Sequence, residues 1–299
     1  MNVRSAAARL SVRVSPPIEP AERPLSDLAA IRKREARRRR LKVAGLRVLV
    51  SVLFFGSWEL TARLGWLDAF FWSQPSAIVA KLWIWVTQGT DQGPLWDQVL
   101  VTMEETVGGF VAGSILGVVF GVALGRSRLL SDVLGVYIKA ANAIPRVILG
   151  ALFAVVLGLD LRAKIATAAV LVFFVVFFNA YQGVREVDRN LIANARILGA
   201  SDRQLTTEIL IPSALSWIVA SLHTSFGLAL VGAVVGELFG ATAGLGELIY
   251  AAKNNFDVAG VFAGMTLLAA MALVAEALIT ALENRLIKWR PQAVTEARI

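Results

Sequence analysis

Six long apolar runs constrain this chain more than any other feature of its sequence. They cover residues 44–63, 105–125, 135–159, 164–184, 213–238 and 258–282. A helix that crosses the hydrocarbon core of a bilayer needs about 20 mostly apolar residues, and each run has roughly that length. The chain is 57% hydrophobic and only 17% charged, which departs from the balance of soluble domains. The sequence therefore predicts an all-α membrane protein with six transmembrane helices.

The net charge of +8 is carried by residues 1–42, because basic and acidic residues balance in the rest of the chain. We therefore divide the chain into a basic N-terminal tail, 1–42, and a transmembrane domain, 43–299. The basic run Arg32–Arg40 is typical of nucleic-acid binding or of a cytoplasmic anchor on anionic lipid. A membrane span follows at once, so we favour the anchor and predict no nucleic-acid partner. Deleting 1–42 separates the two readings, since only a nucleic-acid binder would lose its activity.

The short connections between the runs predict the orientation. Basic residues collect on the cytoplasmic side of membrane proteins, so the tail is expected inside. Alternation of six spans then places 125–132, 193–212 and 284–290 inside, and 159–164 outside. Both termini are expected in the cytoplasm, and Leu67–Val99, rich in Trp, Phe, Pro and Gly, suits the outer interface.

Several kinds of chemistry lack their motifs. The chain has no cysteine and one histidine, and it contains neither H-E-x-x-H nor the phosphate-binding G-x-x-x-x-G-K-[ST] pattern. We therefore expect no metal site and no nucleotide site in this chain.

The second run carries glycine at every fourth position. Glycines spaced in this way let another membrane helix approach closely along one stripe, so we predict a helix-packing role. The glycines are Gly109, Gly113, Gly117, Gly121 and Gly125.

Polar residues inside the third, fourth and fifth runs predict a solute pathway. Interrupted spans and ionisable groups at membrane depth often mark such pathways. A helical projection places His223 and Glu237 on one face of the fifth run. The alternatives are a simple kink at Pro145, a hydrogen bond from His223 to a neighbouring helix, and Glu237 in water at the outer interface. The candidate pathway residues are Asn142, Pro145, Arg146, Asn179, His223 and Glu237.

A polar hairpin, Ala193–Pro212, separates the fourth and fifth runs. Gly199 interrupts the first helix, Ser201 and Asp202 can cap a second one, and Pro212 marks its junction with the next span. As a DNA-binding motif the hairpin is weak. It is better suited to docking a cytoplasmic protein.

This hairpin resembles the signature of the membrane permease subunits of binding-protein-dependent ABC importers. That signature is E-A-A, three residues, G, nine residues and I-x-L-P, and its spacing fits throughout, with Ile211 where leucine is usual. Two positions depart: Ala193 replaces the acidic residue and Asn194 the first alanine. The charged contact that the family makes with the ATPase is then either absent or supplied by another residue, such as Asp202 or Glu208. The resemblance also implies which residues couple the permease to the ATPase. They are Ala193, Asn194, Ala195, Arg196, Gly199, Ala200, Ser201, Asp202, Ile209 and Pro212.

The resemblance extends over most of residues 45–291. The glycine ladder, "AIP" at 143–145, "GELFGATAGLG" at 236–246 and "LENRLIKW" are similar to the nitrate, sulfonate, taurine and bicarbonate subfamily, although Ala151 stands where a second proline is common. It implies a type I importer permease fold with a cytoplasmic coupling-helix loop between helices 4 and 5. It also implies an inner-membrane location and a second permease subunit, either another copy of this chain in a homodimer or a close relative. The implied partners are two ATPase subunits that hold ATP and Mg and an external solute-binding protein, so this chain is expected to have no enzymatic activity of its own.

The cargo follows less directly from the sequence. The subfamily implies a small anion, such as a sulfonate, taurine, nitrate, bicarbonate or a carboxylate. One alternative is the same permease importing a thiamine precursor or another uncharged heterocycle. A second alternative is a transporter or channel that works without ATP, which would predict an internal repeat and more charges deep in the spans.

Overall fold

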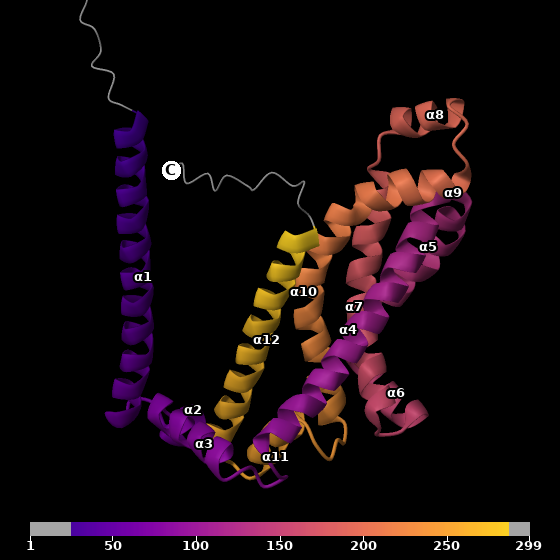
Figure 1. Ribbon diagram of the computed structural model, residues 1–299. Helices are drawn as coiled ribbons and strands as arrows, with labels where there is room; N and C mark the ends of the chain where they lie inside the picture. Colours follow the sequence, from indigo (N-terminus) through magenta and orange to yellow (C-terminus); the bar gives the residue numbers. More distant parts are fainter. Residues whose placement is uncertain (1–24, 287–299) are drawn as a thin grey trace, which may run out of the picture. The chain divides into compact units, whose positions relative to one another are not determined.

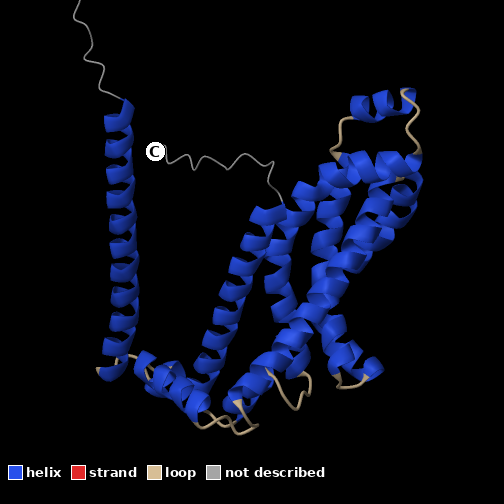
Figure 2. Ribbon diagram, in the orientation of Figure 1, coloured by secondary structure: helices blue, strands red, loops and turns tan. Residues whose placement is uncertain are grey.

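The computed structural model describes residues 25–286, and every regular element in that part of the chain is a helix (Figures 1 and 2). Among these helices, η1 is a π-helix. The elements are α1 (Leu25–Arg63), α2 (Ala69–Trp72), α3 (Pro75–Thr87), α4 (Leu95–Arg126), α5 (Arg128–Ala143), α6 (Arg146–Leu157), α7 (Leu161–Arg185), α8 (Arg189–Ile197), α9 (Asp202–Gln204), η1 (Leu205–Leu210), α10 (Ile211–Leu238), α11 (Leu245–Asn254) and α12 (Val258–Leu286).

The predicted all-helical membrane fold is confirmed. Among the described residues, five helical segments are long and apolar enough to span a membrane, and a bent pair of helices brings the number to six if the pair counts as one span. The single segments are Arg34–Arg63, Leu95–Arg126, Leu161–Arg185, Asp202–Leu238 and Val258–Ala281. The predicted tail at 1–24 and the basic residues at 287–290 lie outside the described residues.

The chain divides into two units, residues 1–57 and 58–299. The described part of the first unit is the helix α1, which continues past the predicted end of the tail at residue 42 and reaches Arg63 in the second unit. Between Arg34 and Ser57 every side chain is exposed, although the spanning segment has a mean hydropathy of 1.6. Such an apolar surface suits contact with lipid.

The third predicted span, 135–159, is not one straight helix. Its first half, α5, begins earlier, at Arg128, and its second half, α6, is bent away from it by 88°. Proline disfavours helical backbone in the residue before it, and Ile144 accordingly is extended, with φ −67° and ψ 132°. Pro145 then caps α6. The expected interruption at Pro145 is therefore present, but it redirects the chain rather than kinking a continuous span.

The second unit is organised around the contact between α4 and α7. The five glycines at every fourth position of α4 are all buried or nearly so, and a methyl group on any of them would overlap α7. Gly232 and Gly183 allow similarly close contacts between α7 and α10. Small residues at such contacts let helix backbones approach in lipid, where apolar burial alone gives little driving force. The α7 residues that the α4 glycines meet are Ala168, Ala169, Val172, Phe173, Val176, Phe177, Ala180, Tyr181 and Val184.

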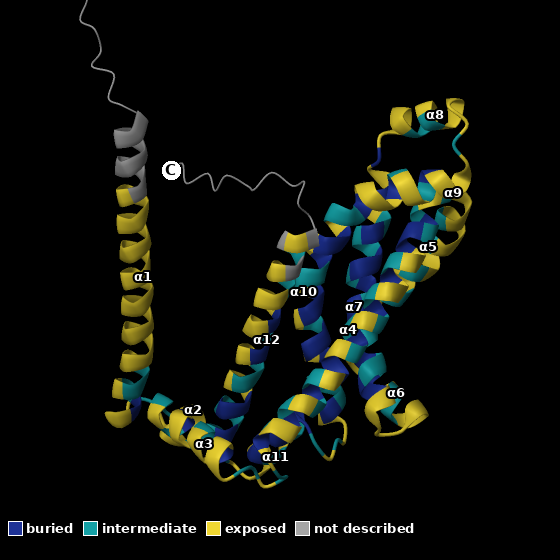
Figure 3. Cartoon of the chain, in the orientation of Figure 1, coloured by how far each residue is buried: buried dark blue, intermediate teal, exposed yellow. Residues whose placement is uncertain are grey.

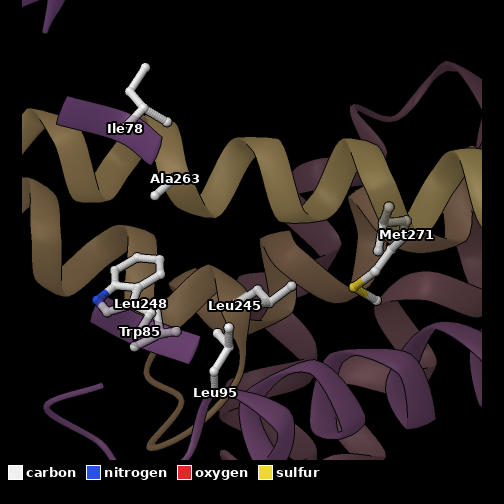
Figure 4. Close-up of a cluster of buried hydrophobic side chains, with 8 residues drawn as sticks. Ile78, Trp85, Leu95, Leu245, Leu248, Ala263 and Met271 are labelled. Carbon is white, nitrogen blue, oxygen red and sulfur yellow. The ribbon is translucent and has the colours of Figure 1, made fainter. Parts of the chain in front are cut away.

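An apolar cluster closes the end of this unit opposite the hairpin (Figure 4). It joins α3, α4, α11 and α12 with Leu230 of α10, whereas α8 and α9 lie at the other end, where α4 and α7 end and α10 begins (Figure 1). Figure 3 shows the buried residues concentrated on α4, α7 and α10. The labelled members of the cluster are Ile78, Trp85, Leu95, Leu245, Leu248, Ala263 and Met271.

Candidate docking hairpin and solute pathway

The first arm of the hairpin is α8, and its two ends are fixed by local hydrogen bonds. Asp188 Oδ1 accepts a hydrogen bond from the backbone N–H of Asn190 (2.8 Å) at the start. At the other end the Gly199 N–H donates to the Arg196 carbonyl and the Ala200 N–H to the Ala195 carbonyl, both at 3.0 Å. This pair of bonds is a Schellman motif, and Gly199 provides the left-handed residue it needs, with φ +86°.

The second arm begins with a capping box. Ser201 Oγ accepts a bond from the Gln204 N–H (3.3 Å), and Gln204 Oε1 accepts one from the Ser201 N–H (2.9 Å). The arm then passes through η1 into α10, which begins at Ile211, so the junction predicted at Pro212 is present as a change from π-helix to α-helix and not as a break in the chain's helical path. A proline clashes with the carbonyl four residues earlier, and the wide π turn just before it relieves that conflict.

The tip of the hairpin exposes two large apolar side chains. Ile197 is 82% and Leu198 87% exposed, and nothing lies near the Cα of Gly199 on the side where a Cβ would project. Of the signature residues, Arg196 forms a long ion pair with Asp202 (3.5 Å), while Ala193 and Asn194 are exposed. Ala195, Ala200 and Ile209 are partly buried. Sequence reasoning did not single out Ile197 and Leu198, although an apolar pair beside a glycine in a polar hairpin was a usable signal.

Four of the predicted pathway residues lie on α5, α6 and α7. Asn142 is partly buried near the end of α5, and Pro145 is the N-cap of α6. The guanidinium of Arg146 lies over the ring of Phe174, 5.5 Å from its centroid. Asn179 donates to the Val175 carbonyl of its own helix (2.8 Å), which satisfies one of its two amide N–H groups locally. Their assignment to a pathway stays a prediction.

His223 is held between two carboxylates of α12. Its Nδ1 is 2.8 Å from Glu276 Oε1, and its Nε2 is 2.9 Å from Glu283 Oε2. Such a helix-to-helix hydrogen bond was one of the alternatives for His223. The two glutamates were absent from the sequence prediction, because sixty residues separate Glu283 from the histidine along the chain.

Glu237 lies apart from His223, in a fully buried network. It has no exposed surface, and Thr102 Oγ1 donates to its Oε1 at 2.6 Å. Its Oε2 accepts a hydrogen bond from the Gly246 N–H. In this conformation Glu237 cannot touch a solute, and its contacts hold the connection between α10 and α11 against α4. The interface position in water, considered from the sequence, is excluded by the same burial.

The same network extends to other side chains of α4. Gln98 Oε1 accepts from the Gly244 N–H (2.8 Å), and Thr102 Oγ1 accepts from the Leu245 N–H (2.8 Å). The glycine-rich segment 240–246 thus receives the hydrogen bonds that an irregular backbone needs at this depth. Nearby, burial raises the pKa of the Glu247 carboxyl, partly offset by the bond from Gln92.

A cavity of about 400 Å³ lies among α4, α5 and α7 towards the hairpin end. Arg185 is fixed in it, because its Nη1 donates to Tyr181 Oη at 2.6 Å and to Ser131 Oγ at 3.2 Å. Lys139 adds a second cation and Asp132 one carboxylate. Arg185 and Ser131 are 54 residues apart in sequence, so their hydrogen bond could not be predicted from the sequence alone. The aromatic side chains that line the cavity are Phe177, Phe178 and Tyr181.

The membrane helices, the exposed hairpin and the buried polar network together define a membrane transport protein. Residues 109–288 match the family described as the binding-protein-dependent transport system inner membrane component, and the chain belongs to that family. It is accordingly a permease component of an ABC importer.

Named relatives cover most of the chain. SsuC of Bacillus subtilis, named for aliphatic sulfonates transport, is 28% identical over 89% of this chain and 95% of its own. The riboflavin transport system permease protein RibX of Chloroflexus aurantiacus is 31% identical over 78% of this chain and 85% of its own. The formylaminopyrimidine transport permease protein ThiX of Halalkalibacterium halodurans is 27% identical over 78% of this chain and 91% of its own.

The fold also matches a solved transporter. A chain of the MetNI methionine ABC transporter in an inward-facing conformation aligns with a TM-score of 0.53 at 21% identity. The alignment covers 65% of this chain and 96% of that chain. This likeness supports the type I importer permease fold inferred from the hairpin.

Proposed function

We propose that this chain forms the solute pathway of an ATP-driven importer in a bacterial inner membrane, with both termini in the cytoplasm. A second permease copy completes the pathway as a homodimer, and an external binding protein delivers the solute. Two separate ATPase subunits hold ATP and Mg and bind the hairpin 193–212. The observation that carries this proposal is the exposed apolar tip formed by Ile197 and Leu198 on a hairpin whose two arms are capped.

The hairpin is built to transmit motion. Its second arm continues into α10 without a break, so a displacement of the tip moves a membrane-spanning helix directly. The first arm follows α7 closely in the chain, since α7 ends at Arg185 and α8 begins at Arg189. A motor that binds the hairpin differently in two states shifts the equilibrium between inward-facing and outward-facing spans. The chain itself performs no covalent step in this scheme.

The double change Ile197→Ser and Leu198→Ser tests the docking tip. Each large apolar side chain contributes roughly 1.5–3 kcal/mol when fully buried, so we expect the ATPase to be lost from the purified complex by at least about tenfold. The measurement is the ratio of ATPase to permease after affinity purification. Ile144→Ser and Leu157→Ser, also exposed but outside the hairpin, serve as the control. An unchanged ratio in the hairpin variant would refute docking at the tip.

We further propose that the cargo is a small organic anion, such as a sulfonate, that passes through the cavity of Arg185 and Lys139. Arg185 is held by Tyr181 and Ser131, so it is oriented before any solute arrives. An arginine in a fixed position is well suited to two oxygens of a sulfonate or carboxylate. The rival cargo is an uncharged heterocycle, favoured by the riboflavin and formylaminopyrimidine relatives and by the aromatic wall of the same cavity.

Charge and aromatic variants separate these cargoes. For an anion we expect Arg185→Gln to lower uptake about tenfold, because a charge-assisted hydrogen bond contributes roughly 1.5–3 kcal/mol. Phe178→Leu should then have a small effect. For an uncharged heterocycle we expect the opposite, with a large loss of uptake from Phe178→Leu and a small one from Arg185→Gln. The solutes to be tested come from a thermal-stability screen of the external binding protein with nitrate, bicarbonate, sulfonates, carboxylates, riboflavin and thiamine precursors, since a bound ligand raises its unfolding temperature.

A further inference from the structure

A second cavity, of about 500 Å³, lies behind the hairpin rather than at its tip. Its walls are the turn between α4 and α5, the end of α7, the inner side of α8, and η1. Of the described elements, η1 is the only one with more than marginal contacts to α8, and α8 has no buried residue. The first arm of the hairpin therefore stands over this cavity with little side-chain packing to hold it.

The cavity concentrates positive charge. Its lining includes a single acidic residue, Asp202, which is engaged with Arg196 at 3.5 Å. Nearby acids are also engaged, since Asp188 caps α8 and Glu186 accepts a hydrogen bond from Gln182 (3.0 Å). The arginines that line the cavity are Arg126, Arg128, Arg185, Arg189 and Arg196.

Three of these arginines have no counter-charge within the described chain. Arg126, Arg128 and Arg189 form neither a hydrogen bond through their side chains nor an ion pair with any of the side chains that the structure describes. Arg128 is also the first residue of α5, next to the positive end of a helix dipole that the uncharged Ser127 caps, whereas the Asp188 carboxylate caps α8 beside Arg189. A cation at that position is unfavourable unless an anion is close by. The described side chains therefore leave the positive charge of these three arginines without a direct counter-charge.

We propose that this arginine cavity binds a phosphate-bearing anion, which ties α8 to the α4–α5 turn. Guanidinium groups bind phosphate oxygens through paired hydrogen bonds, and several converge here from different elements. The volume suits a headgroup or a small free anion. The phosphate is either that of an anionic lipid headgroup or a free phosphate of the cytoplasm. The exposed tip at Ile197 and Leu198 remains available to the ATPase.

The experiment measures ligand-induced stabilisation of the full chain, without the ATPase, so a negative result leaves the proposed transport function untouched. The protein is placed in nanodiscs of phosphatidylcholine, and its thermal unfolding is followed by tryptophan fluorescence as inorganic phosphate is added at constant ionic strength. A second arm replaces part of the lipid with phosphatidylglycerol. Stabilisation by inorganic phosphate identifies a free anion, and stabilisation only by phosphatidylglycerol identifies a lipid headgroup.

Variants locate the effect in the cavity. We expect the double variant Arg126→Gln with Arg189→Gln to need at least a fivefold higher ligand concentration for half of the maximal stabilisation. Arg126→Lys should keep most of the binding. Arg203→Gln is the matched control, because Arg203 belongs to the same hairpin but does not line the cavity. If the double variant misfolds, Arg128→Gln alone replaces it. The proposal is overturned if neither ligand stabilises the protein more than chloride and phosphatidylcholine, or if the cavity variants respond as the control does.

Discussion

Replacing Gly199 with aspartate is expected to abolish solute uptake while the protein stays in the membrane at its normal level. Aspartate tolerates the left-handed conformation that Gly199 adopts, and nothing lies within 4 Å of the added Cβ, so the hairpin should still form. The new carboxylate, however, lies beside Leu198 at the docking tip. Burying an unpaired charge in an interface costs several kcal/mol, so we expect uptake to fall by roughly a hundredfold.

The matched control is Gly199→Asn, which has nearly the same shape and the same tolerance for the left-handed backbone but no charge. We expect it to keep most of the uptake. Uptake is measured in membrane vesicles or intact cells, with the permease quantified by immunoblot in each strain. If the aspartate and asparagine variants transport equally well, the tip is not a desolvated interface, and the coupling role of the hairpin fails.

The hydrophobic pattern predicted most of the fold, because the length of an apolar run and the thickness of a bilayer are linked directly. It did not predict the direction of the chain. Pro145 signalled an interruption, but the 88° turn between α5 and α6 depends on how those helices pack. The junction expected at Pro212 is present, but its form was not predictable. A proline in the sequence indicates a lost N–H and a steric conflict, and here a π turn relieves the conflict, so that the helix changes type without ending.

The candidate site could be predicted where the interacting residues are close to one another in sequence. The cap at Ser201, the left-handed glycine at 199 and the glycine stripe of α4 depend on neighbours within a few positions or on one repeating interval. The buried partners of Glu237 depend on the tertiary fold. A helical projection grouped it with His223. In the structure, however, Glu237 is hydrogen-bonded to α4 and His223 to α12. A projection gives the direction of a side chain but not the helix it meets.

A buried charge network near Glu237 is the second place where a large effect is expected. Lys164 Nζ lies 3.1 Å from Glu105 Oε1, with side-chain exposures of 10% and 1%, and Glu237 interacts electrostatically with both. Three helices, α4, α7 and α10, each contribute one of these charges. The Lys164 ammonium therefore lies beside two buried carboxyl groups in the centre of the α4–α7–α10 contact.

Replacing Lys164 with methionine should destabilise the protein by about 3–5 kcal/mol, since removing one partner leaves the other charge buried without compensation. We expect the thermal midpoint in detergent to fall by roughly 6–15 °C, on the usual scale for chains of this size. Adding Glu105→Gln to Lys164→Met removes the uncompensated carboxylate and should restore most of the loss. The double variant thereby separates a charge effect from a change of shape, because methionine is present in both proteins.

Lys81→Met is the matched control for this prediction. Lys81 pairs with Asp257 at 2.6 Å, but both side chains are more than a quarter exposed, so water compensates the charge that is left. Such a pair is expected to contribute less than about 1 kcal/mol. Equal losses from Lys81→Met and Lys164→Met, or a double variant no more stable than Lys164→Met alone, would show that the buried lysine acts only through its packing. The connection 240–246 would then be held by Thr102 and Gln98 without help from the charge network.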